Sequence, residues 1–527
     1  MNFKLRKKAK VCGRKVCRLL PFAFLFLSFF FVTACRNSVQ NTNSAVAVET
    51  PTPPPIDLHK PLEVSQRAED IALAKKIDEM IERSEFAAAR WGVFVVSLKD
   101  GRVLVARDAQ KLFTPASVLK IITGAVALDR LGSQFRWQTK IFAAGNIENG
   151  VLDGDIILYG QGAPDFSEAE IDALADQLRA KGLKKINGDV VGDDSYFKGD
   201  ALGDGWAWNE LQWYYGAEAS ALSINRNEVD LTLKNGKPSI APENDLIQIS
   251  GEVRVNRDGE PDAIGVKREL DENRIYVWGE GKKLDVRIAV KNPALWSARI
   301  LKNSLEKKGV AVTGEARTVG WKTKDKTDVE KASEIASIES RNLGEIVRKM
   351  NKDSVNLYAE LILRTLGKHF GDSAPDENPR FEKLRGDDAA GAAVIKKWLL
   401  ENGASFYETE SVRDGSGLSR LNLLTPETIG RALIAANQMK ESRVFRDSLP
   451  IAGKDGTLRN RLGSVAGRIA AKTGSISMVG SLAGYAESPD GETFAFVIIC
   501  NNETRRAESS VLIDAIAAEI ANFQTAR

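Results

Sequence analysis

The chain has 527 residues, of which 43% are hydrophobic and 28% charged, and its formal net charge is +3. This length and balance indicate two or three packed domains and exclude a disordered or fibrous protein. Subtracting the eight basic residues found in the first 34 positions leaves a charge of −5, so the rest of the chain has no basic excess that would indicate nucleic acid as a partner.

The N-terminus is typical of an export signal. Its basic residues precede an apolar run at residues 19–32, which is shorter than the roughly 20 residues needed to span a bilayer. We therefore assign residues 1–34 to a cleaved signal peptide. The sequence Val32-Thr33-Ala34-Cys35 resembles a bacterial lipobox, which predicts a lipid on Cys35 and a membrane anchor; the alternative is ordinary secretory cleavage, with Cys35 incidental. Arg36, where aspartate would favour the inner membrane, implies retention at an outer membrane, and the expected location is the periplasm or cell envelope.

Only one cysteine is left for the body of the chain. Cys12 and Cys17 leave with the signal peptide, and Cys35 would carry the lipid. The remaining Cys500 lies in an apolar, strand-like run. We expect it to be a buried small residue, with no intrachain disulfide.

After the signal, residues 35–62 are first polar and then rich in proline, which is typical of an extended tether. Helical periodicity follows within residues 73–81. The apolar runs at residues 91–96 and 103–105 flank an Asp100-Gly101 turn and predict a β-hairpin. Thr114-Pro115 then marks the start of a helix that is apolar over much of its circumference, as in a buried helix.

The middle of the chain, residues 141–334, changes to short β-like runs separated by glycine and Asp-Gly turns, with one clear helix at residues 168–181. We interpret it as a β-rich insert of one or two lobes. The catalytic domain would then comprise residues 63–140 and 335–527.

The C-terminal part combines helices with a sheet. Helical patterns occupy residues 335–366, 388–400 and 428–439. Three strands and a helix follow at residues 468–473, 479–486, 493–500 and 508–523. Neighbouring strands joined by short turns indicate an antiparallel sheet, here flanked by helices, and hence an α+β fold.

The first candidate motif is Ser117-Val118-Leu119-Lys120, in the first turn of the buried helix. Residues three apart on a helix share a face, so Lys120 can reach the Ser117 hydroxyl, and apolar surroundings lower the pKa of a lysine toward that of a general base. The spacing alone is weak evidence, because Ser195 with Lys198 and Ser304 with Lys307 match it too. For Ser304 a solvated helix face is the better interpretation.

The second motif, Ser354-Val355-Asn356, begins a predicted helix, where a short loop can direct Ser354 at the nucleophile. The same spacing at Ser223 and Ser340 has no such context. The third motif is Lys472-Thr473-Gly474-Ser475, at the end of a predicted strand. Its glycine permits close approach of a ligand, and Lys472 supplies positive potential.

Other chemistries find little support. The chain has only two histidines, His59 and His369, which excludes a Ser-His-Asp triad and leaves no zinc site of the usual spacing. We therefore predict no metal and no organic cofactor. Four clustered aromatic residues could stack on sugar, but a core cluster is the favoured interpretation: Trp206, Trp208, Trp213 and Tyr214.

With these motifs in order, the chain resembles the D-alanyl-D-alanine carboxypeptidase/endopeptidase family, the class C low-molecular-mass penicillin-binding proteins. The spacing of more than 200 residues between Lys120 and Ser354 is similar to that family and longer than in β-lactamases. The resemblance also rests on Ser354-Val355-Asn356-Leu357-Tyr358-Ala359-Glu360, Asp414-Gly415-Ser416-Gly417-Leu418-Ser419 and Gly453-Lys454-Asp455-Gly456-Thr457-Leu458. It implies the β-lactamase/DD-peptidase-like transpeptidase fold with a large inserted region.

The resemblance also implies roles for the site residues. Ser117 would attack the carbonyl of the penultimate D-alanine, with neutral Lys120 as base. Ser354 would relay a proton and Asn356 would hold the substrate amide. The terminal carboxylate would be bound by the third motif: Lys472, Thr473, Gly474 and Ser475. Backbone N–H groups of Ser117 and Ser475 would form the oxyanion hole.

The implied function is a serine-type D-Ala-D-Ala carboxypeptidase or DD-endopeptidase that acts on peptidoglycan stem peptides through an acyl-enzyme and binds β-lactam antibiotics as inhibitors. Two alternatives remain open at this point. One is a β-lactamase or esterase on the same fold, and the other is a lipid-tethered module that senses penicillin or binds peptidoglycan with little catalysis.

Overall fold

The computed structural model of the chain describes residues 55–234, 236–323, 329, 331–371 and 386–524. The predicted signal peptide, Cys35 and most of the predicted tether lie outside these ranges. Within them, no helix is both long enough and apolar enough to cross a membrane.

A five-stranded antiparallel sheet joins the two ends of the described chain. Its order is β17-β18-β19-β1-β2. The strands are β1 (Arg90–Ser97), β2 (Val103–Arg107), β17 (Ile469–Ile476), β18 (Val479–Glu487) and β19 (Thr493–Asn501). These are the strands that the apolar runs predicted, with one correction. Because β17 continues to Ile476, the Lys472-Thr473-Gly474 motif lies inside the strand and not at its end.

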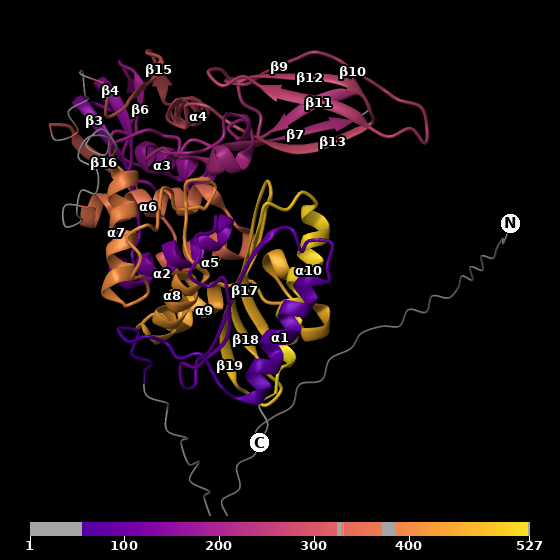
Figure 1. Cartoon of the computed structure of the whole chain (residues 1–527). Coiled ribbons are helices and arrows are strands. Elements are labelled where there is room, and N and C mark those ends of the chain that lie inside the picture. The colour runs from indigo at the N-terminus through magenta and orange to yellow at the C-terminus, as the bar shows by residue number, and fades with distance from the viewer. Residues whose placement is uncertain (1–54, 235, 324–328, 330, 372–385, 525–527) are drawn as a thin grey trace, which may run out of the picture. The chain divides into compact units, whose positions relative to one another are not determined.

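Helices cover both faces of this sheet (Figure 1). A separate hydrophobic core lies on each face. Along β1, Val93 and Val95 belong to the first core, with α1 (Ala68–Glu82) and α10 (Arg506–Asn522), whereas Phe94 and Val96 belong to the second core. That alternation is the period of two that places successive side chains of a strand on opposite faces. The second core includes the buried helix α2 (Leu119–Leu131) and α8 (Pro426–Gln438). Cys500, in β19, is fully buried, which confirms the expectation of a buried cysteine, and burial raises the pKa of its thiol to about 12.

Further helices complete this part. They are α5 (Leu343–Asp353), α6 (Asn356–Phe370), α7 (Asp387–Glu401) and a short α9 (Ser442–Ser448) that the sequence analysis missed. Only Ser354 and Val355 separate α5 from α6. Ser354 has a left-handed backbone with φ of 58°, which ends α5 and turns the chain sharply before α6 begins.

Residues between α2 and α5 form two groups of strands. The first group is a sheet of seven strands, and β3 (Gln138–Glu148) and β4 (Val151–Gly160) lie at its centre. The others are β5 (Lys185–Ile186), β6 (Val190–Asp193), β14 (Ala311–Val312), β15 (Ala316–Val319) and β16 (Ser333–Glu339). Two helices accompany them, α3 (Glu168–Ala180) and α4 (Pro293–Lys307), where the sequence analysis identified one.

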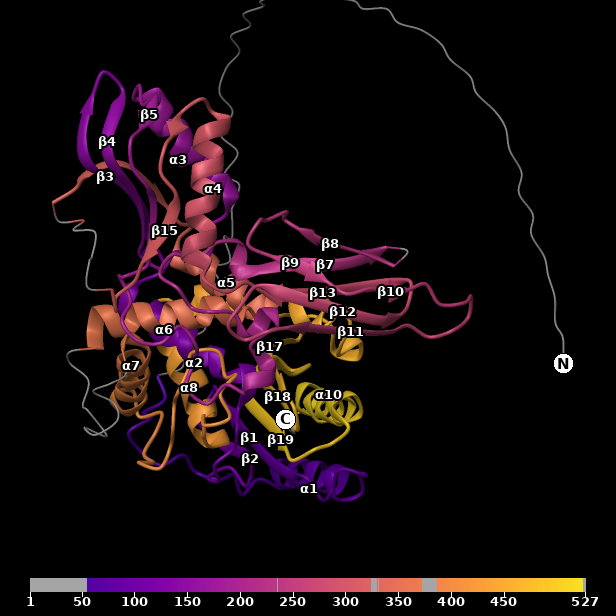
Figure 2. The same ribbon diagram turned by 90° about the horizontal axis from the view of Figure 1, so that it is seen from above.

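The second group is a pair of small sheets (Figure 2). One holds β7 (Glu228–Lys234), β8 (Lys237–Ala241) and β13 (Lys283–Ala289). The other holds β9 (Gln248–Ser250), β10 (Val253–Arg254), β11 (Ala263–Arg268) and β12 (Arg274–Glu280). Apolar residues of both sheets, such as Leu231 and Val277, are buried in the same core. The division into a catalytic domain and a β-rich insert remains our interpretation of this arrangement.

Candidate active site

Ser117 lies in a single 3-10 turn, Ala116–Val118, that leads directly into α2. This turn sets Ser117 and Lys120 one above the other, and the Lys120 Nζ is 2.8 Å from the Ser117 Oγ. The pair predicted from the spacing is therefore in contact. Lys120 is fully buried, whereas Ser117 lines a cavity.

The Lys120 amine has two further partners, both carbonyl oxygens. Its Nζ donates to the Asn356 Oδ1 and to the backbone carbonyl of Ser416, each at 2.7 Å. Burial lowers the pKa of Lys120 to about 7, against the opposing effect of the negative charges of Asp414 and Glu360. A large share of this lysine is therefore neutral near neutral pH.

Asn356 has one possible orientation at this site. Its Nδ2 donates to the backbone carbonyl of Tyr215 at 2.9 Å, so its Oδ1 must face Lys120. Tyr215 belongs to a short turn, Tyr214–Gly216, from the middle of the chain. A segment of the predicted insert thus fixes a residue of the second motif.

The loop after Asp414 is held by two buried carboxylates. The Glu360 Oε1 accepts the backbone N–H groups of Gly415 and Ser416 at 3.0 and 2.9 Å, and the Asp414 Oδ1 accepts that of Gly417 at 2.8 Å. These bonds hold the Ser416 carbonyl in place as a partner of Lys120. Burial, with a smaller contribution from Asp414, raises the pKa of Glu360 to about 7. Both carboxylates belong to the quoted family motifs, but neither was among the predicted site residues.

The third motif contacts the second. The Lys472 Nζ donates to the Ser354 Oγ and to the Thr473 carbonyl, each at 2.8 Å. Lys472 is fully buried, and burial, together with the positive charge of Lys120, lowers its pKa well below the ordinary value. The Thr473 hydroxyl donates to the Thr457 hydroxyl at 2.8 Å, which adds Thr457 to the predicted residues.

Gly474 lets β17 approach the candidate nucleophile. A Cβ atom at this position would lie 2.1 Å from the Ser481 Oγ and 3.1 Å from the Ser117 backbone N. The first distance is shorter than any van der Waals contact allows, so only glycine fits. The close approach seen here is to protein atoms, and the approach of a ligand that the motif predicted stays a prediction.

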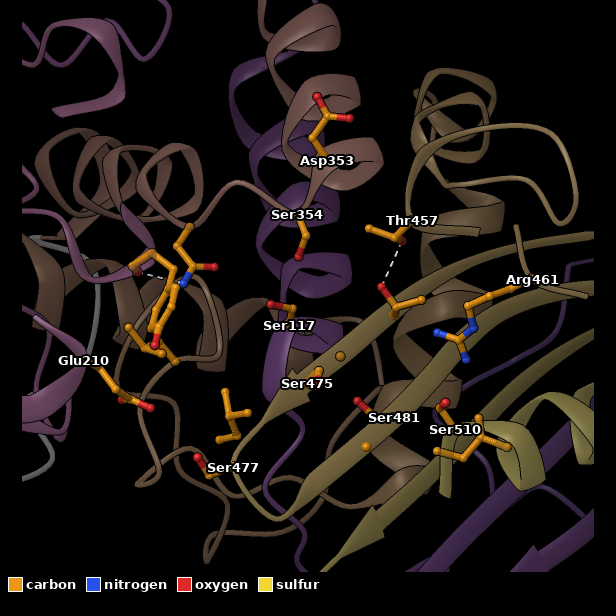
Figure 3. Close-up of a pocket in the computed structure, with 18 of the residues that line it drawn as sticks. Ser117, Glu210, Asp353, Ser354, Thr457, Arg461, Ser475, Ser477, Ser481 and Ser510 are labelled. Carbon is orange, nitrogen blue, oxygen red and sulfur yellow. Dashed lines mark hydrogen bonds between the residues drawn. The ribbon is translucent and has the colours of Figure 1, made fainter. Parts of the chain in front are cut away.

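A cavity of about 780 Å³ opens above these residues. Figure 3 shows Ser117, Ser354 and Ser475, from three separate elements, on its wall. Asn356, Thr473 and Gly474 also line it, whereas Lys120 and Lys472 are buried. All eight predicted site residues therefore come together at one place.

The middle of the chain supplies the opposite wall of this cavity, with Glu210, Tyr214 and Tyr215. Glu210 is only 8% exposed and its Oε2 has no hydrogen-bond partner in the described structure. Burial raises the pKa of its carboxyl group, against the charge of Arg420. No motif in the sequence pointed to this residue.

The four aromatic residues that we predicted to form a core cluster do not all lie in a core. Trp208 is 66% exposed, Tyr214 lines the cavity, and the Trp206 Nε1 donates to the Asp414 Oδ2 at 2.9 Å. Trp213 packs against the main hydrophobic core, and Trp206 packs against a smaller cluster that contains Ala116. The interpretation as a core cluster was therefore wrong for Trp208 and Tyr214, which contact cations and, for Tyr214, the cavity, and hydropathy does not report such contacts.

The competing serines have structural roles. Ser195 lies in a turn after β6, and the Ser223 hydroxyl is buried against the Ser220 carbonyl. Ser340 accepts the backbone N–H of Trp137 at 3.0 Å. Ser304 is buried and donates to Asp172, so the solvated face that we predicted there is wrong. No group of three metal-ligating side chains occurs among the described residues.

The fold and the site together indicate a class of protein, a serine hydrolase in which a buried lysine contacts the candidate nucleophile. The sequence profile of the D-Ala-D-Ala carboxypeptidase 3 (S13) family matches residues 73–523. The chain therefore belongs to this family of serine-type carboxypeptidases and penicillin-binding proteins, as the resemblance predicted.

Individual relatives agree with this assignment. The D-alanyl-D-alanine carboxypeptidase of Actinomadura sp. (strain R39) is 29% identical over 475 residues, which cover 86% of this chain and 85% of the relative. The D-alanyl-D-alanine carboxypeptidase DacB of Haemophilus influenzae is 28% identical over 425 residues, 78% of this chain and 85% of the relative. The crystal structure of penicillin binding protein 4 (dacB) from Haemophilus influenzae aligns with a TM-score of 0.73 and 27% identity, covering 85% of this chain and 99% of that one. These matches confirm the predicted α+β transpeptidase fold.

Proposed function

We propose that this protein hydrolyses the D-Ala-D-Ala terminus of peptidoglycan stem peptides, and D-Ala cross-links to the next stem, through an acyl-enzyme on Ser117. The observation that carries the proposal is the contact between Ser117 and a fully buried Lys120 whose pKa is lowered to about 7. A lysine in that state is a general base at working pH.

The hydrogen bonds of Lys120 give the direction of the proton. A neutral amine has two N–H donors and one lone pair, and two of the three partners of Lys120 are carbonyl oxygens that can only accept. The lone pair is therefore left for the hydroxyl of Ser117. Ser117 donates its proton to Lys120 as its Oγ attacks the substrate carbonyl.

The remaining motif residues act on the other parts of the substrate. The backbone N–H groups of Ser117 and Ser475 stabilise the negative charge on the attacked carbonyl oxygen, and each such donor is worth about 3 kcal/mol in comparable enzymes. Ser354, hydrogen-bonded to Lys472, relays to the leaving amine the proton that Lys120 took from Ser117, so that both Lys120 and Ser354 return to their starting states. Lys472 and the hydroxyls of Thr473 and Ser475 bind the terminal carboxylate, and Asn356 holds the substrate amide.

β-Lactam antibiotics acylate the same serine in this mechanism. A second solved structure of penicillin binding protein 4 (dacB) from Haemophilus influenzae is a complex with a novel β-lactam, and it aligns with a TM-score of 0.68 and 26% identity over 84% of this chain.

The present protein works in the periplasm or envelope, held to the membrane by a lipid on Cys35. A Cys35→Ala protein is then released from the membrane fraction, whereas wild type sediments with it.

Mass spectrometry after incubation with benzylpenicillin tests the acyl-enzyme. A stable adduct on the tryptic peptide that contains Ser117 is the expected result, and it is absent in Ser117→Ala. Ser477→Ala is the matched control, because Ser477 lines the same cavity but has no role in the mechanism. Rapid hydrolysis of penicillin without an adduct indicates a β-lactamase instead. No adduct and no hydrolysis, in a folded protein, leaves a binding module as the function.

A further inference from the structure

One face of strands β11 and β12 carries two aromatic side chains, the exposed Trp278 and the half-buried Tyr276. Lys267 pairs with Tyr276, and Gly265 pairs with Trp278, across the antiparallel ladder. Directly paired residues point to the same face, so Tyr276 and Trp278 lie side by side on it. The opposite face carries the fully buried Ile275 and its neighbours, so this aromatic face points away from the core. We define the aromatic strip as Trp208, Lys267, Tyr276 and Trp278.

Trp278 lies flat on this face. A Cβ atom at Gly265 would be 2.1 Å from the Trp278 Cε2, which shows that the indole covers the glycine. Trp278 is nevertheless 53% exposed. One face of the ring is therefore against the strand and the other is open to solvent, which is an unusual cost for a tryptophan that no core requires.

The strip continues toward the active-site cavity. The Lys267 ammonium lies over the Trp208 ring, 5.4 Å from its centroid. Trp208 is two residues from Glu210, which lines the cavity. Leu211, which follows Glu210, is hydrogen-bonded to β11, since the Arg268 guanidinium donates to the Leu211 carbonyl at 2.6 Å. The aromatic strip thus ends at Trp208, in the same short 3-10 turn as Glu210, which lines the cavity.

We propose that the aromatic strip binds the glycan chain of peptidoglycan while a stem peptide attached to that chain occupies the active site. The inference rests on the proposed function, since it takes the polymer to be the substrate. Pyranose rings present flat C–H faces between polar edges, and a flat, exposed indole matches such a face, with large apolar area and little side-chain entropy to lose. The shared turn of Trp208 and the cavity-lining Glu210 selects the glycan, because the stem peptide in the cavity and the sugar are parts of one molecule.

Binding of peptide-free glycan strands, prepared by amidase digestion of peptidoglycan, tests the proposal directly. Tryptophan fluorescence is expected to change on titration of wild type, and Trp208→Ala and Trp278→Ala each weaken binding by about fivefold or more, the loss typical of an exposed aromatic anchor. Val255→Ala is the matched control, because Val255 is an exposed apolar residue of the same sheet region, just after β10, outside the strip. Equal binding by all four proteins overturns the proposal.

A second readout compares two substrates that carry the same pentapeptide, one free and one attached to glycan strands. The ratio of D-Ala release from the polymer to release from the free peptide falls about fivefold in each tryptophan variant and stays at the wild-type value in Val255→Ala. An unchanged ratio, or a fall that accompanies a change of oligomeric state in sedimentation velocity, overturns the glycan assignment. Failure of the proposed function has a different signature, because wild type then releases no D-Ala from the free peptide and forms no penicillin adduct, whereas the fluorescence titration still tests the strip.

Discussion

The pH dependence of acylation is the sharpest test of the buried lysine. In the proposed mechanism only neutral Lys120 accepts the proton of Ser117, so the acylation rate follows the neutral fraction of this lysine. Burial lowers its pKa to about 7 from an ordinary value of 10.5. The rate should therefore rise with pH and reach a plateau just above neutrality.

The size of the increase in acylation rate distinguishes a lowered pKa of Lys120 from the ordinary value. With a pKa of about 7, the neutral fraction grows from roughly 9% at pH 6 to roughly 91% at pH 8, which is about tenfold. With the ordinary value of 10.5, the same change of pH increases the neutral fraction about 100-fold, and no plateau appears below pH 10.

Stopped-flow measurement of the second-order rate constant with benzylpenicillin, from pH 5.5 to 9, makes this comparison, since the carboxylate of the drug stays ionised throughout. Lys120→Arg carries a fixed charge and should acylate at least about 100-fold more slowly at every pH. Ser354→Ala removes the partner of Lys472 but leaves the contact of Lys120 with Ser117 intact, so it should keep the same midpoint.

A rate that climbs steadily to pH 9, or one that ignores pH, would refute the assignment of Lys120 as a buried neutral base. A midpoint that moves by a full unit in Ser354→Ala would instead assign the titration to Lys472, the second buried lysine of the site.

Three further predictions follow from the same contacts. Between pH 7 and 10.5 the unfolded chain keeps a proton that folded Lys120 has released, so the unfolding free energy of wild type rises relative to Lys120→Met by about 2 kcal/mol from pH 7 to 9, measured by chemical denaturation. Thr457→Val removes the acceptor of the Thr473 hydroxyl, and the KM for a D-Ala-D-Ala peptide increases about threefold to tenfold with a smaller change in kcat. Gly474→Ala displaces β17 from the nucleophile and lowers the rate of penicillin acylation about 100-fold or more.

Each of these predictions has an outcome that would contradict it, and the third has a matched control variant. A free-energy difference between wild type and Lys120→Met that is flat with pH contradicts the first. A fall in kcat with constant KM contradicts the second, because it places Thr457 in the chemical step. For the third, Gly463→Ala is matched, since a Cβ atom there meets nothing within 4 Å, and equal acylation rates in the two alanine variants contradict the close approach.

The sequence predicted those features that neighbouring residues determine. The strands of the five-stranded sheet are short apolar runs bounded by turn residues, and the lysine of the first motif is one helical turn from its serine. Both patterns were read correctly because they depend on local backbone geometry. The order of the motifs, with a long spacing between the first two, led to the family that the profile match confirms.

The supporting shell of the site could not be predicted in this way. Glu360 and Gly415 are 55 positions apart, and Asn356 and Tyr215 are 141 apart, yet each pair is hydrogen-bonded. Trp208 is among the aromatic residues that could stack on sugar, but the sequence favoured a core role, and Glu210 belongs to no motif. Periodicity reports whether a position faces a core, and it carries no information about which distant segment covers a cavity or leaves a ring exposed.

The two buried lysines have one consequence that neither has alone. The charge of Lys120 helps to lower the pKa of Lys472, so the two ammonium groups compete and the site disfavours two protons at once. The carboxylates of Asp414 and Glu360 favour the charged form of Lys120. In the proposed mechanism the carboxylate of the substrate favours protonation of Lys472. The charge on Lys472 then disfavours the ammonium form of Lys120, which opposes the effect of Asp414 and Glu360. Arrival of the correct terminus thus helps to generate the neutral base that attacks it, which gives a physical reason for a carboxypeptidase to keep both lysines out of water.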